Sequence, residues 1–321
     1  MSGAALVRVA VAVILRRDGA VLLAQRIAGT PYAGYWEFPG GKLEAGETAA
    51  QGLARELQEE LGIEVTRATP WITQRYVYPH AHVELEFFRV YAWQGEPYGR
   101  DGQSIAWQMP GAFDVAPLLP ANSVVLRALT LPPVYAISMA EDLGEELFLS
   151  RARVALDDGV RLIQLREKSF SEARLARLAA TLTALARPRA ARVLLNGEVG
   201  TARRLGCDGV HWTAAHLMAA QTRPDDMLCA ASCHDAEELA QAAGLGVDFA
   251  VLGPVKATPS HAGVNPLGWA RFAQLVHGTP IPVYALGGLD RGDLDIAMSH
   301  GAHGVALRRA AWSGRNLSAL V

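Results

Sequence analysis

Cysteine is scarce in this sequence, which has three among 321 residues. Cys207, Cys229 and Cys233 are too few and too unevenly spaced to build a zinc site or a disulfide framework. In a reducing compartment such thiols are ordinarily buried and unpaired. We therefore expect buried free thiols here.

An excess of charge of either sign is lacking as well. Lys and Arg together number 30, against 32 Asp and Glu, so the formal net charge is −2 at pH 7. This balance implies no basic surface for a nucleic-acid polymer, and any nucleotide that the protein uses is expected to be free in solution.

The beginning of the chain has no long apolar run. The stretch from Ala10 to Leu15 is too short to span a membrane and leads into a charged hairpin turn. No signal peptide is evident. We expect a soluble cytoplasmic protein that does not act at a membrane.

What the sequence does contain is the segment GKLEAGETAAQGLARELQEELGI, residues 41–63. Its residues 48–61 have the composition of a helix, and Gly62 is placed as the C-terminal stop. Leu53, Leu57 and Leu61 recur at every fourth position, so they should form the buried stripe of this helix.

Glutamates of the same helix should lie close together. Glu56 and Glu60 fall on one face, with Glu59 beside them. Like charges at this spacing destabilise an isolated helix by roughly 0.2–0.5 kcal/mol per pair, so a bound cation best explains the cluster. Carboxylate oxygens suit Mg²⁺ or Mn²⁺ held jointly with substrate phosphates, and Arg55 could fix the carboxylates by bidentate pairing. The alternative is a solvated acidic helix face.

Residues 41–63 also fit the Nudix box, G-x5-E-x7-R-E-U-x-E-E-x-G-U, at every fixed position. Residues 1–130 resemble the MutT branch of the Nudix hydrolases, which removes 8-oxo-dGTP from the nucleotide pool. The segments that extend the resemblance are VAVAVILRRDGAVLLAQR (9–26, a strand, a turn at 16–19 and a second strand), YWEFPGGKLEAGE (35–47), WQGEPYGRDGQ (93–103) and LLPANSVV (118–125). The resemblance implies an α+β Nudix fold with a mixed sheet between helices, and Mg²⁺-dependent hydrolysis of 8-oxo-dGTP to 8-oxo-dGMP and pyrophosphate.

The resemblance implies roles for individual residues. Its catalytic residues would be Glu56 (the base), Glu59 and Arg55; its metal ligands Gly40, Glu56, Glu59 and Glu60; its substrate-binding residues Arg26, Glu37, Phe38, Tyr78 and Asn122. The amide of Asn122, in the PAN segment, would hydrogen-bond the oxidised guanine. A turn residue after Pro120 is the alternative for Asn122, and ordinary core is the alternative for Tyr78. Ala106 replaces a glutamate of the MutT relative, so water activation should rest on the box.

The chain is too long for one Nudix domain, and the prolines in RALTLPPV (127–134) indicate a short linker. Beyond it, short apolar runs alternate with amphipathic stretches such as residues 171–186. The runs are VYAI (134–137), RLIQL (161–165), VLL (193–195), GVHW (209–212), LCAAS (228–232), FAVLG (249–253), VYALGG (283–288) and GVAL (304–307). This alternation predicts a (β/α)8 TIM barrel over residues 131–321, with an open doubly wound sheet as the alternative.

The ends of the predicted strands resemble thiamine-phosphate synthase and its relative, the thiazole tautomerase TenI. The matching motifs are QLREK (164–168), LLNGEV (194–199), GVHWTAAHL (209–217), GPVKATPSHAG (253–263) and ALGGL (285–289). The resemblance implies a site for a phosphorylated thiamine precursor, built from Gln164, Arg166, Lys168, Asn196, Thr258, Gly287 and Gly288, to which Arg308 could add.

Departures from the synthase pattern argue against synthase activity. Gly197 and His216 stand where the synthase has Mg²⁺-binding aspartates, and His261 replaces a lysine. The spacing of His211, His216, His234, His261 and His303 matches no compact metal motif, so they should be hydrogen-bonded loop residues. Two alternatives stay open: a thiamine-pathway bifunctional enzyme whose Nudix half hydrolyses pyrimidine or thiamine-related diphosphates, or a barrel that only binds.

Overall fold

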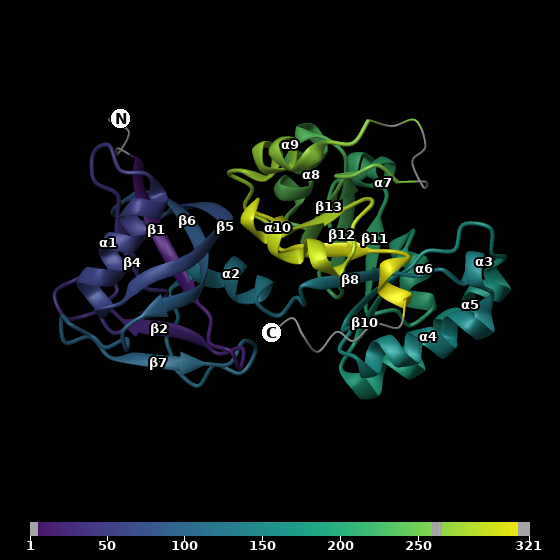
Figure 1. The fold of residues 1–321 in the computed structure, drawn as a ribbon, viewed down its shortest axis with the longest axis horizontal. Helices are drawn as coiled ribbons and strands as arrows, with labels where there is room; N and C mark the ends of the chain where they lie inside the picture. Colours follow the sequence, from purple (N-terminus) through teal and green to yellow (C-terminus); the bar gives the residue numbers. More distant parts are fainter. Residues whose placement is uncertain (1–5, 259–262, 264, 314–321) are drawn as a thin grey trace. The chain divides into compact units, whose positions relative to one another are not determined.

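The computed structural model describes residues 6–258, 263 and 265–313. The chain passes from one compact unit to a second between Thr130 and Leu131 (Figure 1). No helix among the described residues is long and apolar enough to cross a membrane.

The first unit contains two sheets. The larger has the order β4-β1-β6-β5, in which β1 runs parallel to β6 and antiparallel to β4. Its strands are β1 Leu6–Ile14, β4 Gly40–Lys42, β5 Glu64–Val77 and β6 His82–Gln94. The smaller sheet has the order β3-β2-β7, with β2 Val21–Gln25, β3 Trp36–Glu37 and β7 Ile105–Gln108. Alternate residues of β1 are buried in two cores, one containing α1 (Ala49–Leu61) and the other α2 (Ser123–Ala128). The mixed sheet between helices is as predicted.

Helix α1 forms as the sequence indicates. Thr48 caps its first turn in a capping box with Gln51, and Gly62 ends it with a φ of 69°. Leu53, Leu57 and Leu61 are at most 1% exposed, so the predicted stripe is the buried one. This stripe packs the helix against the sheet, while Glu59 is exposed and Glu56 and Glu60 are partly buried at the side of the stripe.

The predicted hairpin near the start of the chain is only partly correct. The turn forms, since the Arg16 N–H donates to the carbonyl of Ala20 at 2.9 Å. However, β1 and β2 belong to different sheets, and an isolated bridge pairs Leu15 with Val21 beside them. The reason is that both edges of β1 are already occupied, by β4 and β6.

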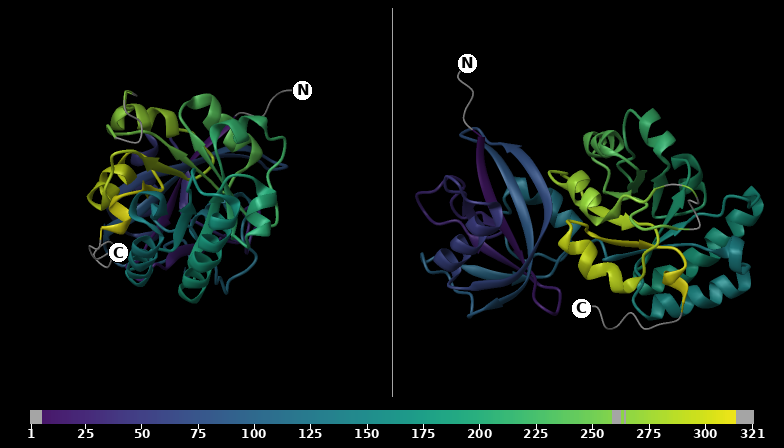
Figure 2. Two further views of the ribbon diagram at one scale, coloured as in Figure 1. Left: turned by 90° about the vertical axis from the view of Figure 1, so that its right-hand side faces the viewer. Right: turned by 45° about the horizontal axis from the view of Figure 1, so that its top comes forward.

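The second unit is a closed parallel barrel with the strand order β10-β11-β12-β13-β14-β15-β8-β9 (Figure 2). The strands are β8 Val134–Ile137, β9 Leu162–Leu165, β10 Arg192–Asn196, β11 Gly209–Trp212, β12 Leu228–Cys233, β13 Phe249–Leu252, β14 Val283–Leu286 and β15 Gly304–Leu307. Every predicted apolar run forms one of these strands. Pairing of β8 with both β15 and β9 closes the barrel and rules out the open sheet.

Helices surround these strands, as the predicted alternation requires. They are α3 Ala140–Leu143, α4 Glu145–Asp157, α5 Glu172–Ala186, α6 Val199–Arg204, α7 Ala214–Ala219, α8 Ala236–Leu245, α9 Gly268–Val276 and α10 Leu294–Ser299. Short 3₁₀ turns are η1 Pro120–Asn122 in the first unit, and η2 Arg187–Arg189, η4 Arg291–Asp293 and η5 Ala310–Trp312 in the barrel.

The predicted linker is shorter than its prolines suggested. Leu131 is 7% exposed and packs in the barrel core beside Tyr135 and Tyr284. The carbonyl of Pro132 accepts a hydrogen bond from the Tyr284 hydroxyl at 2.5 Å, and that of Pro133 accepts one from the Val305 N–H at 2.9 Å. These prolines therefore belong to the barrel, at the N-terminal ends of its strands.

Candidate functional sites

Arg55 organises the carboxylates of α1. Its Nε and Nη2 atoms bond both oxygens of Glu47, at 2.8 and 3.1 Å, and its Nη1 lies 3.0 Å from an oxygen of Glu56 and 3.0 Å from one of Glu59. The pairing with Arg55 lowers the pKa of Glu47 to about 2. Sequence reasoning had not assigned a role to Glu47, although its fixed place in the box was a signal.

Glu60 lies beside Glu56 in a partly buried acidic cluster. Burial, followed by repulsion from Glu56 and Glu37, raises the pKa of Glu60 to about 7, against a hydrogen bond from the backbone of Gly40 that lowers it. A Cβ atom on Gly41 would lie 2.1 Å from the carboxyl carbon of Glu56. Glycine at this position of β4 therefore allows the carboxylate to lie against the strand.

This cluster fits a divalent cation in its chemistry. Hard oxygen ligands suit Mg²⁺ or Mn²⁺, and a cation would relieve the repulsion that raises the pKa of Glu60. No three acidic, histidine or cysteine side chains among the described residues converge as a ready metal site. Because Arg55 engages Glu56 and Glu59, their oxygens would have to turn toward the ion. Phosphates of a substrate would supply further ligands.

Arg26, Glu37 and Tyr78 form a second group in the first unit. The Arg26 guanidinium lies 2.6 Å from a Glu37 oxygen and also donates to the carbonyl of Pro31 at 2.6 Å. Burial raises the pKa of Glu37 despite this partner. Burial and the charge of Glu37 raise the pKa of Tyr78, which is 8% exposed and stacked on His80. Tyr78 also packs in the hydrophobic core, which agrees with the alternative that it is an ordinary core residue.

Asn122 is buried with part of its side chain unpaired. It ends the turn η1, is 3% exposed, and its Nδ2 has no hydrogen-bond partner among the described residues. It makes no side-chain cap for α2, as a simple turn residue might. Phe38 is 3% exposed and packs edge-on against Phe87. Both rings belong to the hydrophobic core that also contains Ala121, the residue before Asn122. An unpaired buried amide costs about 1–3 kcal/mol, so Asn122 has the properties of a ligand-binding residue.

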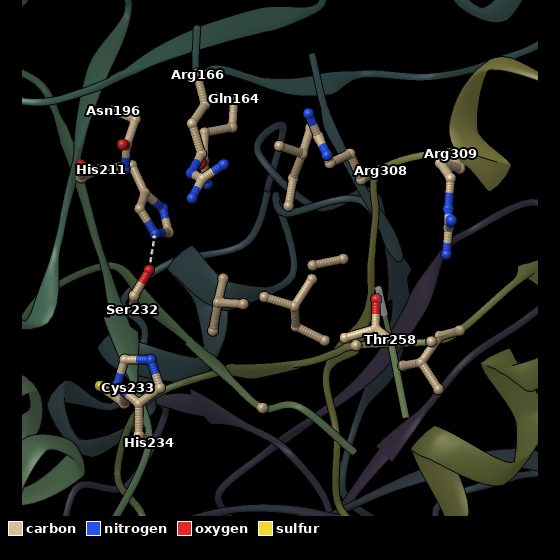
Figure 3. A pocket seen from close by; sticks show the side chains of 18 of the residues that line it. Gln164, Arg166, Asn196, His211, Ser232, Cys233, His234, Thr258, Arg308 and Arg309 are labelled. Atoms are coloured by element: carbon tan, nitrogen blue, oxygen red, sulfur yellow. Dashed lines mark hydrogen bonds between the residues drawn. The ribbon is translucent and has the colours of Figure 1, made fainter. Parts of the chain in front are cut away.

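The barrel has a cavity of about 500 Å³ at the C-terminal ends of its strands (Figure 3). All of the predicted ligand residues line it: Gln164, Arg166, Lys168, Asn196, Thr258, Gly287 and Gly288. Arg308 lines it too. Sequence reasoning missed Thr213, Ser232, His234 and Arg309, although each follows or ends a predicted strand.

The glycine pair of this cavity could not be replaced by larger residues. Gly287 and Gly288 have φ values of 106° and 65°, and a Cβ on either would lie 2.5 Å from a neighbouring atom, of Pro254 and Ala257 respectively. The loop after β14 can therefore lie directly against the segment after β13. Gly287 is buried and Gly288 is exposed, and both line the cavity. A glycine backbone at such a place is suited to holding a phosphate.

The prediction of hydrogen-bonded loop histidines was wrong for His211 and correct for His303. His211 is fully buried inside β11, with Nδ1 3.2 Å from the Tyr135 hydroxyl and Nε2 2.9 Å from the Ser232 hydroxyl. Burial, and then the charge of Arg166, lower its pKa to about 3. His303 precedes β15 at the opposite end of the barrel, where its Nε2 lies 3.1 Å from the carbonyl of Leu131. The two-residue period of the strand turns His211 inward.

The remaining predictions about histidine and cysteine have mixed outcomes. His216 is in α7 and His234 follows β12, while His261 lies outside the described residues. Gly197 and His216 place no carboxylate at the two positions where the synthase has aspartates. All three cysteines are free and buried, as expected, and burial raises the pKa of Cys207 to about 11.

Comparisons with known proteins match each unit separately. The family model described as thiamine monophosphate synthase matches residues 134–311, and that of the NUDIX domain matches residues 6–128. The 8-oxo-dGTP diphosphatase of Haemophilus influenzae is 39% identical over 124 residues, which cover 39% of this chain and 91% of that protein. The CTP pyrophosphohydrolase of Escherichia coli is 40% identical over 124 residues (37% and 87%). The putative thiamine-phosphate synthase of Geobacter sulfurreducens is 36% identical over 178 residues (54% and 84%).

Proposed function

Because the chain belongs to the Nudix family over residues 6–128 and to the thiamine monophosphate synthase family over residues 134–311, we propose a two-part function for it. Its Nudix domain, residues 1–130, hydrolyses 8-oxo-dGTP in the cytoplasmic nucleotide pool to 8-oxo-dGMP and pyrophosphate. Its barrel domain, residues 131–321, binds a phosphorylated ligand and has no synthase activity. Both resemblances seen in the sequence are confirmed by the family matches.

Asn122 is the observation that supports the oxidised nucleotide as substrate. Its buried Nδ2 lacks a partner among the described residues and could donate to an acceptor of the base. An amide also carries an oxygen, which could accept a hydrogen bond from a donor of the base. Oxidation at C8 of guanine adds a proton at N7, so the base gains a donor that dGTP does not have. A site that hydrogen-bonds such a group discriminates against a base that lacks it, because its own polar atoms are then left unpaired.

The acidic cluster supports hydrolysis by an activated water. Bound Mg²⁺ or Mn²⁺, held by Glu56, Glu59, Glu60 and the backbone of Gly40, would neutralise charge on the phosphates and lower the pKa of the water. Glu56 then takes the proton of the attacking water, and Arg55 keeps that carboxylate oriented through Nη1. Arg26 and Glu37 orient each other beside the nucleotide. Ala106, in β7, contributes no carboxylate, so the base comes from α1.

Barrel-ligand binding is supported by the convergence of the predicted residues on one cavity. We expect no synthase activity from the barrel, because Gly197 and His216 stand at the positions of the two Mg²⁺-binding aspartates of the synthase and carry no carboxylate. The family of the barrel also favours a second candidate, a thiamine-pathway enzyme whose Nudix domain hydrolyses thiamine-related or pyrimidine diphosphates.

Substrate comparison tests the proposal. Pyrophosphate release is measured with Mg²⁺ for 8-oxo-dGTP, dGTP and CTP, and phosphate release for thiamine diphosphate, using the intact chain and Glu56→Gln. We expect preference for 8-oxo-dGTP and loss of activity in the variant. Faster turnover of CTP or of thiamine diphosphate would contradict the proposed substrate, and full activity of Glu56→Gln would contradict its role as base.

A further inference from the structure

The strand β5 of the Nudix domain carries an amide side chain on its inner face. Residues 73–77 of this strand pair with β6 in continuous register, so alternate side chains lie on opposite faces of the sheet. Arg75 is 75% exposed and pairs with Glu84 on one face. Tyr76 packs against the hydrophobic core on the other face, which Gln74 shares with it.

The amide of Gln74 is not satisfied by the protein around it. Its partner across the two strands is Leu85, which is 8% exposed and belongs to the same hydrophobic core as Tyr76. The Oε1 atom of Gln74 is buried and has no hydrogen-bond partner among the described residues. A buried acceptor without a partner destabilises a fold, so a ligand that donates to this atom best explains a glutamine here.

Asn122 presents the complementary atom to the same core. The residues Ala121 and Val125, close to it in the chain, pack in the core that contains Leu85. The buried Nδ2 of Asn122 also lacks a partner within the described ranges. An amide acceptor and an amide donor, from β5 and from η1, therefore both await a partner against one hydrophobic core. A base that carries a donor and an acceptor would satisfy both.

The inner face of β5 leads from Gln74 to the residues proposed to bind the nucleotide. Tyr76 contacts Tyr78, with ring centroids 4.6 Å apart. Burial, and then the charge of Glu37, raise the pKa of Tyr78, so the Glu37 carboxylate lies near that phenol. Glu37 in turn pairs with Arg26. Gln74 is therefore on the side of the sheet that faces the proposed nucleotide site.

We propose that Gln74 is a specificity-determining residue of the Nudix domain, whose Oε1 accepts a hydrogen bond from the 2-amino group of the guanine ring. This deepens the proposed hydrolysis of 8-oxo-dGTP and rests on it. Asn122 is assigned to the oxidised edge of the base, where the donor at N7 adjoins a carbonyl oxygen. The 2-amino group projects from the opposite edge, which an acceptor on the sheet serves while Asn122 keeps its own bonds. Gln74 thus selects guanine over a purine without this group, and Asn122 selects the oxidised form.

The effect of Gln74→Met on base preference tests this inference. The quantity measured is the ratio of kcat/KM for 8-oxo-dGTP to that for 8-oxo-dITP, which lacks the 2-amino group. Methionine is also long and unbranched but has no amide oxygen. We expect the intact chain to favour the guanine nucleotide about tenfold or more, and Gln74→Met to bring the ratio close to one by slowing that nucleotide alone. Gln94→Met, the same substitution at an exposed position of β6, should leave the ratio unchanged.

A ratio near one in the intact chain, or an unchanged ratio in Gln74→Met, overturns the role of Gln74. Because Gln74→Met removes a buried acceptor that lacks a partner among the described residues, its thermal midpoint should not fall. If it nevertheless unfolds, Gln74→Glu decides: this variant keeps an acceptor and should keep the preference, whereas a lost preference contradicts the inference.

The pair dGTP and dITP, measured in parallel, separates this inference from the proposed substrate. A preference for dGTP that depends on Gln74 supports the inference even where the oxidised base is not favoured, and that outcome overturns the proposed substrate alone. A preference for 8-oxo-dGTP over dGTP, with no effect of the 2-amino group, overturns the role of Gln74 alone. Hydrolysis of none of the four nucleotides overturns the proposed function, and this inference with it.

Discussion

The Arg55 guanidinium donates hydrogen bonds to both oxygens of Glu47, at 2.8 and 3.1 Å, and so joins the loop before α1 to the middle of that helix. Its third nitrogen is then directed at Glu56 and Glu59, each 3.0 Å away. A planar fork with this many donors can make all of these bonds at once. The position of the proposed base therefore depends on the geometry of arginine, and charge alone is not enough.

Arg55→Lys should impair hydrolysis while the protein stays folded. Lysine keeps the charge but cannot bond Glu47 and Glu56 simultaneously, so we expect kcat to fall about tenfold or more. Steady-state pyrophosphate release is the measurement. Arg8→Lys is the matched control, because it makes the same substitution in the Arg8–Glu86 ion pair, where Arg8 is half exposed. This control should leave kcat unaltered. Equal rates for Arg55→Lys and the intact chain would show that the fork has no part in catalysis.

Metal affinity of the Nudix domain should rise with pH up to about 7. Glu60 has its pKa raised to about 7, so below that pH a proton occupies the carboxylate that the cation needs. Mn²⁺ binding followed by electron paramagnetic resonance should therefore strengthen between pH 6 and 7.5 and then level off. In Glu60→Gln the rise should disappear. An equally steep rise in that variant would assign the titration to another group.

His211 should stay neutral across the ordinary pH range. Its pKa is lowered to about 3, first by burial and then by Arg166, so the ring carries no charge at pH 5 or above. Nitrogen chemical shifts of the His211 imidazole should therefore be constant from pH 5 to 8. A midpoint above pH 6 for His211 would contradict the buried setting between Tyr135 and Ser232.

Local patterns in the sequence were enough to predict helix α1 and the eight strands of the barrel, whereas the long strands β5 and β6 were not predicted. Helix α1 carries its capping residues, its leucine stripe and its terminal glycine within one segment, so each signal supports the others. The barrel strands are buried apolar runs such as β11, whose period of two also determines that His211 faces inward. The convergence of residues after β9, β10 and β14 on one cavity follows from their position at the same ends of parallel strands.

Features that depend on distant parts of the chain could not be predicted in this way. Nothing near Arg308 indicates that it lies close to Arg166 and bonds Asp142. The burial of Leu131 depends on the tyrosines of two strands, and the separation of β1 from β2 depends on which strands occupy the edges of β1. The buried Nδ2 of Asn122, which has no partner within the described ranges, is likewise a property of the folded core.

The most direct test of the central claim is the selectivity of Asn122→Ala, measured as the ratio of kcat/KM for 8-oxo-dGTP to that for dGTP. Ser123→Ala, at the exposed next position, is the control. If Asn122 recognises the oxidised base, its loss should lower kcat/KM for 8-oxo-dGTP about 10- to 100-fold with little effect on dGTP. An unchanged ratio, with both substrates affected equally or not at all, would contradict the assignment of this domain to the oxidised nucleotide.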